Sequence, residues 1–177
     1  MDLSQPFETE RLYFRILNMD DLNDVYKQFS DPDMCSYFSE PPVDLNEAKE
    51  IIEHYKDPNG KAYLRYGMFD KNTNAFIGTC GYHYWDQTLK QVEIGYDIWK
   101  DYWRKGYISE AIPVILNICF QHLNVDHVYV FVHPENSASV RSVEKFAFKY
   151  CEPCRKPDDD VTVCMKLVKE DWANLCL

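Results

Sequence analysis

Hydrophobic and polar positions along the chain follow two different periods, which is the pattern of a mixed α/β domain. Residues 11–17, rich in apolar and aromatic side chains, read as a strand. Apolar residues then recur at helical spacing in residues 22–29 and 44–55. Asp44 and Glu47 have the spacing of a capping box at the start of the second helical stretch. The first third of the chain therefore predicts one strand followed by two helices.

Three further strands are predicted at residues 63–69, 75–85 and 91–99. The turns between them, residues 70–74 and 86–88, are polar. Strands joined by such short turns pair in an antiparallel manner. We therefore expect a three-stranded antiparallel unit in the middle of the chain.

A third helix has the clearest pattern, with one apolar stripe formed by Ile112, Ile115, Leu116, Cys119, Phe120 and Leu123. Pro113 is expected near its start, where a missing N–H costs least. Residues 128–132 are apolar on both faces, which indicates a central strand covered on both sides. A fourth helix from about Asn136 and two strands, at about 149–155 and 161–168, complete one expected domain over residues 1–177.

The formal charge of −10 argues against nucleic acid as a partner. An acidic surface attracts cationic amines or basic peptides, but surplus acid also simply keeps a protein soluble. No stretch reaches the roughly 18 apolar residues of a membrane span, and the start lacks a basic and apolar leader, so we expect a cytoplasmic protein. The seven cysteines, an odd number, look like small buried residues in a reducing compartment.

The segment with the most chemical content lies between the strand at 91–99 and the third helix. A helix's first N–H groups and its dipole form an anion site, and Gly106 lets the backbone approach a phosphate. Arg104 and Lys105 add positive charge, and Ser109 can cap the helix or donate to the anion. An ordinary helix start with two solvated cations would have the same pattern.

Four stretches give this pattern a more specific meaning. Residues 102–111 closely resemble the acetyl-CoA signature of the GNAT acetyltransferases, and are most similar to the ribosomal-protein N-acetyltransferase (RimJ/RimL-like) branch. Residues 7–12 with Arg15, residues 93–96, and Asn136 and Ser139 with residues 144–148 resemble the same branch. The matches occur in family order and cover nearly the whole chain.

The resemblance implies the GNAT-type acyl-CoA N-acyltransferase fold. This is an α+β (mixed α/β) fold with a central, mostly antiparallel twisted sheet of about seven strands and four helices. Its fourth and fifth strands, here residues 91–99 and 128–132, splay apart. The resemblance further implies an N-acetyltransferase that moves the acetyl group of acetyl-CoA to a primary amine by direct attack in a ternary complex, without a metal.

By the same resemblance, the backbone of Ile98 and Trp99 would bond the pantetheine arm of acetyl-CoA. Asn136 would also bond this arm, and Ser139 would both contact the cosubstrate and protonate the departing thiolate. A backbone N–H near the end of the fourth strand would polarise the thioester carbonyl. The amides expected to hold the pyrophosphate are those of Arg104, Lys105, Gly106, Tyr107, Ile108 and Ser109.

Glu93 is the best candidate for the base that deprotonates the amine, because its strand borders the acetyl group. Alternation places Asp97 on the same face, and His83 and Asp97 are weaker alternatives. A surface carboxylate without a catalytic role would fit Glu93 equally well.

The chain departs from the family at four positions. Trp103 replaces the usual Gln or Arg, Ile108 replaces a small residue and should narrow the space beside the pyrophosphate, and Ala147 stands where glycine is usual. Val143 occupies the place of the tyrosine that serves many relatives as general acid. Val143 therefore puts a tyrosine acid at that place in doubt.

The acceptor could be a protein N-terminus, a polyamine or another small amine. Residues 38–42, with Tyr82, Tyr84 and Trp85, fit an aromatic, partly acidic mouth for a cationic amine, although each aromatic also fits the core. The exposed aromatics permit a homodimer.

Two other interpretations stay open. One is a catalytically weak acetyl-CoA sensor, favoured by Val143 and disfavoured by Asn136 and Ser139. The other is a zinc or redox site at Cys151, Cys154 and Cys164 with His133, which lacks a second pair at matching spacing.

Overall fold

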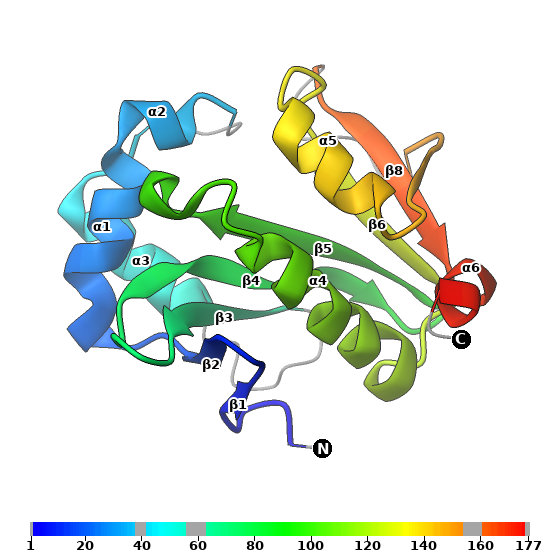
Figure 1. Cartoon of the computed structure of the whole chain (residues 1–177), viewed down its shortest axis with the longest axis horizontal. Coiled ribbons are helices and arrows are strands. Elements are labelled where there is room, and N and C mark those ends of the chain that lie inside the picture. Colours follow the sequence, from blue (N-terminus) through cyan, green and yellow to red (C-terminus); the bar gives the residue numbers. More distant parts are fainter. Residues whose placement is uncertain (1, 38–41, 56–62, 154–160, 176–177) are drawn as a thin grey trace.

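One sheet of eight strands forms the centre of the computed structural model, which describes residues 2–37, 42–55, 63–153 and 161–175. The strand order is β1-β2-β3-β4-β5-β6-β8-β7 (Figure 1), and only β5 and β6 pair in parallel. The strands are β1 (Phe7–Glu8), β2 (Leu12–Ile16), β3 (Tyr63–Asp70), β4 (Phe76–Asp86), β5 (Gln91–Ile98), β6 (His127–Val132), β7 (Lys149–Tyr150) and β8 (Val163–Val168). The predicted sheet is confirmed, with one more strand because Phe7–Glu8 pairs with β2.

The four predicted helices are α1 (Leu22–Ser30), α3 (Leu45–Tyr55), α4 (Tyr107–Asn117) and α5 (Ser137–Glu144). Two short helices, α2 (Pro32–Cys35) and α6 (Lys169–Leu175), were not predicted. Short helical turns also occur: η1 (Met19–Asp21) and η2 (Lys100–Tyr102) are 3₁₀ turns, and η3 (Ile118–His122) is a π-turn.

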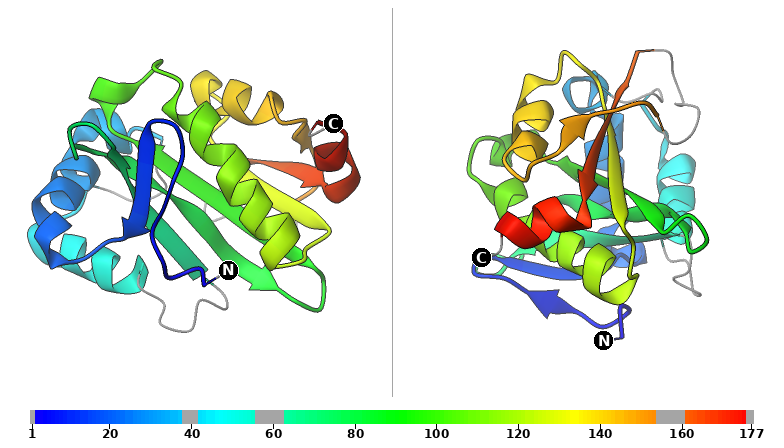
Figure 2. Two further views of the ribbon diagram at one scale, coloured as in Figure 1. Left: turned by 60° about the horizontal axis from the view of Figure 1, so that its bottom comes forward. Right: turned by 90° about the vertical axis from the view of Figure 1, so that its right-hand side faces the viewer.

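The helices cover the two faces of the sheet separately. In Figure 2, α4 lies across one face, where its stripe belongs to the larger hydrophobic cluster. On the other face, α1 and α3 enclose a smaller cluster that includes Leu17, Val25, Phe29, Ala48 and Ile52. Burial of these apolar faces is the main force that fixes the helices to the sheet.

Local signals explain where the helices begin. Asp44 and Glu47 form the predicted capping box: Oδ1 of Asp44 accepts from the N–H of Glu47, and the Glu47 carboxylate accepts from the N–H of Asp44. The third predicted helix, α4, begins at Tyr107 with Gly106 as its N-cap. Pro113 therefore lies inside the helix, not near its start, and cannot donate an N–H to the carbonyl of Ser109.

The predicted splay is present between β5 and β6. These strands pair only at Gln91↔His127, Val92↔Val128 and Glu93↔Tyr129 among the described residues. Past Glu93 the two strands separate, while β6 continues to pair with β8 on its other side. The strand predicted as central is therefore central, and the gap beside it positions the candidate site.

Candidate active site

A cavity of about 730 Å³, here called the splay cleft, opens where β5 and β6 separate. Its walls come from both strands, the segment before α4, the first turn of α4, and α5. Most of the predicted site residues line it: Glu93, Ile98, Arg104, Gly106, Tyr107, Ile108, Ser109, Asn136 and Ser139. Trp99 and Lys105 are not among the described residues that line it.

The N-terminus of α4 faces the splay cleft. Gly106 has φ 81°, in the left-handed region that glycine adopts without strain, and no side chain caps the helix. Ser109 lies in the first helical turn and is not the cap. The N–H groups of this turn have no partner within the helix and, with the helix dipole, favour an anion.

A polar cluster joins this helix start to the segment between β1 and β2. The Glu110 carboxylate accepts from the Thr9 hydroxyl (2.5 Å) and from the backbone N–H and Nε of Arg11 (both 2.7 Å). Arg11 also donates to the carbonyl of Lys105. Burial raises the pKa of Glu110, but these hydrogen bonds outweigh it and hold the pKa below its ordinary value. Arg11 thereby neutralises an acid beside the anion site.

Two backbone groups expected to bond the pantetheine arm already have intramolecular partners. The carbonyl of Ile98 accepts from the indole N–H of Trp103 at 2.8 Å. The N–H of Trp99 donates to the carbonyl of Ile77 at 2.8 Å. Trp103, one of the departures from the family pattern, thus closes the segment back onto β5.

Glu93 lies on β5 opposite His83 of β4, and its side chain is largely buried. The Nε2 of His83 donates to Oε1 of Glu93 at 2.7 Å, because a carboxylate only accepts. The His83 ring also stacks against Tyr63, with ring centroids 5.9 Å apart. The two leading candidates for the base therefore form one pair.

A second polar pair lies next to the first on the same face of the sheet. Arg65 of β3 forms a buried ion pair with Asp97 and donates to the Thr79 hydroxyl at 2.8 Å. Burial disfavours the charged form of Arg65, but the Asp97 carboxylate raises the pKa of the guanidinium above its ordinary value. Asp97 is therefore already compensated, which leaves the Glu93–His83 pair as the stronger candidate for proton transfer.

Across the splay cleft, Ser139 bonds to the sheet. Its hydroxyl is 2.9 Å from the hydroxyl of Tyr96, and its N–H donates to the side chain of Asn136, the N-cap of α5, at 3.0 Å. Burial raises the pKa of Tyr96 to about 12, so the phenol keeps its proton at neutral pH. Val143 is fully buried in the larger hydrophobic cluster.

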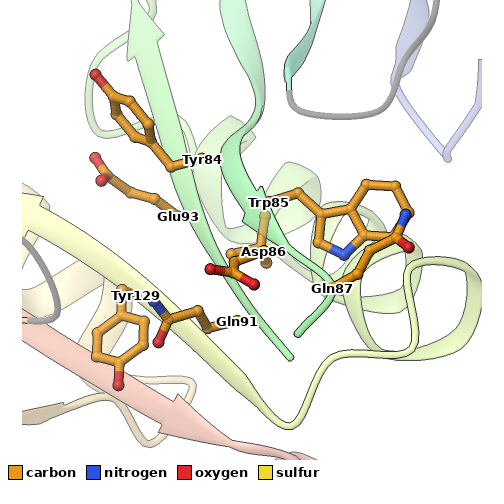
Figure 3. A pocket seen from close by; sticks show the side chains of 8 residues that line it. Tyr84, Trp85, Asp86, Gln87, Gln91, Glu93 and Tyr129 are labelled. Atoms are coloured by element: carbon orange, nitrogen blue, oxygen red, sulfur yellow. The ribbon is translucent and has the colours of Figure 1, made fainter. Parts of the chain in front are cut away.

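A second cavity of about 430 Å³, here called the hairpin cavity, lies where β4 turns into β5. It is lined by Tyr84, Trp85, Asp86, Gln87, Gln91, Val92, Glu93 and Tyr129. Figure 3 shows the carboxylates of Asp86 and Glu93 on the side of the Tyr129 ring, whereas the Trp85 indole points away. Glu93 lines both cavities and therefore connects them.

The predicted aromatic mouth is corrected in part. Tyr82 is only 1% exposed and belongs to the larger hydrophobic cluster, so it is a core residue. Tyr84 lines the hairpin cavity, and Trp85 packs partly against the core. Residues 38–41 of the expected mouth lie outside the described residues.

The family follows from comparison with known proteins. The family model of the acetyltransferase (GNAT) domain matches residues 11–149. The chain belongs to the GNAT acetyltransferases. An uncharacterised N-acetyltransferase of Bacillus licheniformis is 33% identical over 144 residues, which are 80% of each protein. A candidate ribosomal N-acetyltransferase of Bacillus subtilis is 28% identical over 118 residues, 63% of this chain and 61% of that protein.

A solved structure shows the same fold. Spermidine N-acetyltransferase from Vibrio cholerae, in complex with CoA and spermine, superposes with a TM-score of 0.78 over 94% of this chain and 100% of that chain, at 20% identity. The predicted family and enzyme class are thus confirmed: this GNAT protein is an N-acetyltransferase, and the GNAT domain uses acetyl-CoA as its acetyl donor.

The splay cleft of this GNAT protein is also lined by two cations that were not predicted from the sequence. Arg141 and Lys145 of the α5 segment line it together with Arg104. Their spacing of four residues puts them on one helical face, which was the available signal. In a chain with a formal charge of −10, this grouping suits a cosubstrate that carries phosphates.

The structure gives little support to a zinc site in this GNAT chain. The Sγ atoms of Cys151 and Cys164 are 3.5 Å apart, and neither cysteine forms a disulfide among the described residues. Cys154 lies outside the described residues, and within the described part no three His, Cys, Asp or Glu residues come together as metal ligands. None of the described helices is long and apolar enough to cross a membrane.

Proposed function

We propose that the chain acetylates a primary amine by direct attack of the amine on acetyl-CoA, with Glu93 as the base. The observation that carries the proposal is the position of Glu93, which lines both the splay cleft and the hairpin cavity. A base must reach an amine on one side and the thioester on the other. Acetyl-CoA would occupy the splay cleft, and the amine would enter from the hairpin cavity.

The charges of the splay cleft support this placement of acetyl-CoA. The first turn of α4, with Gly106 at its start, offers N–H groups to the pyrophosphate, and Ile108 and Ser109 line the same wall. Arg104, Arg141 and Lys145 supply compensating charge. Because Trp99 and Lys105 do not line the cleft, their backbone groups contribute less to this binding than those of the other predicted residues.

The chemistry requires two proton transfers. The amine, with a pKa ordinarily near that of lysine or an N-terminus, must first give a proton to Glu93. Its nitrogen then forms a bond to the acetyl carbon while the C–S bond breaks. The thiolate takes a proton from Ser139, and the second proton that the nitrogen loses on becoming an amide restores the Ser139 hydroxyl. His83 orients the Glu93 carboxylate, and the Tyr96 hydroxyl, bonded to Ser139, supports the donor. The products are the acetylated amine and CoA thiol.

The test measures thiol release from acetyl-CoA with a panel of amines, together with the mass of each product. Glu93→Gln should lower kcat well over tenfold, about the contribution of a general base, with little change in the Kd of acetyl-CoA. Glu170→Gln, which removes an exposed carboxylate of α6, is the matched control and should keep full turnover.

The outcomes separate catalysis from binding alone. Near-normal turnover of Glu93→Gln would remove Glu93 from the mechanism and direct attention to His83. Tight acetyl-CoA binding without acetylation of any amine would favour the sensor interpretation instead. A protein N-terminal peptide and spermidine both belong in the panel, because relatives are named for acceptors of each kind.

A further inference from the structure

We infer that the hairpin cavity binds the far end of the acceptor, and that the acceptor is a linear aliphatic diamine. One amine reacts beside Glu93 while the second, as an ammonium group, binds beside Asp86. The inference rests on the proposed function, because it names the substrate class of the same site. The second amine does not react, so the transfer step is unchanged.

The positions of the two carboxylates set the length of the diamine. Asp86 of β4 pairs with Gln91 of β5, two residues before Glu93. Two strand residues advance about 7 Å and adjacent strands lie about 5 Å apart, so the Cα atoms of Asp86 and Glu93 are about 8 Å apart. The short alkyl chains of putrescine and cadaverine join two amines over a comparable distance.

The charge of the hairpin cavity favours a cationic ligand. Its lining contains the carboxylates of Asp86 and Glu93, and no lysine or arginine is among the described residues that form it. The splay cleft, in contrast, is lined by cations and carboxylates in equal number: Arg65, Arg104, Arg141 and Lys145, and Asp33, Glu93, Asp97 and Glu135. A cationic acceptor is thus favoured in the hairpin cavity, where the charged side chains among the described lining residues are both carboxylates.

The Asp86 carboxylate is held in place by its own turn. Its Oδ1 accepts from the N–H groups of Thr88 and Leu89, at 2.8 and 2.9 Å. Both of these hydrogen bonds use Oδ1, so Oδ2 can accept from an ammonium group without breaking the turn. An acceptor with one amine and an apolar tail would cover this carboxylate without pairing it, which is unfavourable.

The backbone turns an aromatic ring toward the same place. The β4–β5 pairing shifts register between His83 and Asp86, and Tyr84 within this bulge has φ 53°. A bulky residue in the left-handed region is strained, and bulges re-aim side chains next to active sites. The Tyr84 ring, 57% exposed, lies beside Glu93 in Figure 3, and Tyr129 borders the cavity below it. Aromatic rings attract ammonium groups.

The experiment compares amines on the purified full chain at saturating acetyl-CoA. Putrescine and cadaverine should give at least about a tenfold higher kcat/KM than butylamine, which has one amine of similar length. In Asp86→Asn this ratio should fall about tenfold, because the KM of the diamines rises. The side-chain carbonyl of Asn can still accept the hydrogen bonds from Thr88 and Leu89. Asp20 of η1 is not among the described residues that line either cavity, so the control variant Asp20→Asn should keep the ratio.

A charge reversal gives a result that loss of folding cannot imitate. Asp86→Lys should prefer δ-aminovalerate, which carries a carboxylate in place of the second amine, to cadaverine. Equal kcat/KM for cadaverine and butylamine, an unchanged ratio in Asp86→Asn, or a preference for a neutral N-terminal peptide would overturn the inference and leave amine acetylation standing. Absence of thiol release with every amine would overturn the inference together with the proposed function.

Discussion

At the scale of single residues, Gly95 decides whether two polar pairs can share one face of the sheet. A Cβ at this position would lie 2.8 Å from Nη1 of Arg65 and 3.0 Å from Cε1 of His83. Both side chains are engaged, Arg65 with Asp97 and His83 with Glu93. Glycine is therefore needed here because the space is occupied, and its conformational freedom is not the reason.

The backbone conformation at Ala147, in contrast, is one that favours glycine. It has φ 62° directly after α5, where the N–H of Phe148 bonds the carbonyl of Val143 and the N–H of Ala147 bonds that of Glu144. This is the Schellman arrangement, in which glycine is usual because a Cβ is strained there. Ala147→Gly should therefore raise the free energy of unfolding by about 0.5–1 kcal/mol, after the greater freedom of glycine in the unfolded chain is subtracted.

Chemical denaturation at equilibrium would measure this change. Ala173→Gly is the matched control, because Ala173 is an exposed residue within α6. It should destabilise the protein by about 0.5–1 kcal/mol, the ordinary cost of glycine in a helix. A loss of stability in both variants would show that the strain at Ala147 is negligible.

At the scale of elements, periodicity predicted the long helices and the strands well, and failed for short elements and helix starts. α4 was recognised by its stripe, but the stripe begins only at Ile112, so the first turn with Gly106 as its cap was missed. α2 has four residues, too few for a period, and depends on the capping oxygen of Asp31 and on Pro32 at its start. Such elements are set by local bonds that a hydrophobic pattern does not record.

The parts of the candidate site that lie in one contiguous sequence motif were predicted. The parts that strand pairing brings together were missed. The segment before α4 and Glu93 lie in recognisable stretches. The His83–Glu93 pair and the Arg65–Asp97 pair depend on the register of β3, β4 and β5, which joins residues far apart in sequence. The role of Asp86 likewise depends on a register shift in β4. The register between strands decides these contacts, and it cannot be read from the local sequence.

The cations of the α5 segment lead to a prediction about acetyl-CoA binding. Arg141→Gln should raise the Kd of acetyl-CoA about three- to tenfold, because a cleft-lining cation near phosphates is lost. The salt dependence of binding should weaken at the same time, since fewer charges are screened. Calorimetric titration at two salt concentrations would measure both effects.

Lys149→Gln serves as the control for this prediction. Lys149 of β7 is 72% exposed, pairs with Asp171 and is not among the residues of the splay cleft. Its substitution changes the net charge equally and should leave the Kd of acetyl-CoA nearly unchanged. An equal effect of both substitutions would mean that net charge, and not the α5 segment, governs binding.

At the scale of the whole molecule, the splayed sheet separates two cavities that meet at Glu93. The splay cleft lies among α4, α5 and the separated ends of β5 and β6, whereas the hairpin cavity lies at the β4–β5 turn. Glu93 is the last residue of β5 that pairs with β6, so it marks the point where the sheet opens. The fold thus places the Glu93 carboxylate at the junction of the two cavities.

Separate cavities imply that acetyl-CoA binding and catalysis can be measured independently. A ligand that binds only the folded state at about a hundred times its Kd adds about 2.7 kcal/mol of stability. In a domain of this size, this raises Tm by roughly 5–10 °C. Acetyl-CoA should produce this shift in the unmodified chain and equally in Glu93→Gln and Asp86→Asn, because neither substitution removes one of the cations that line the splay cleft. A shift lost in Asp86→Asn would contradict the separation, since the hairpin cavity would then form part of the acetyl-CoA site.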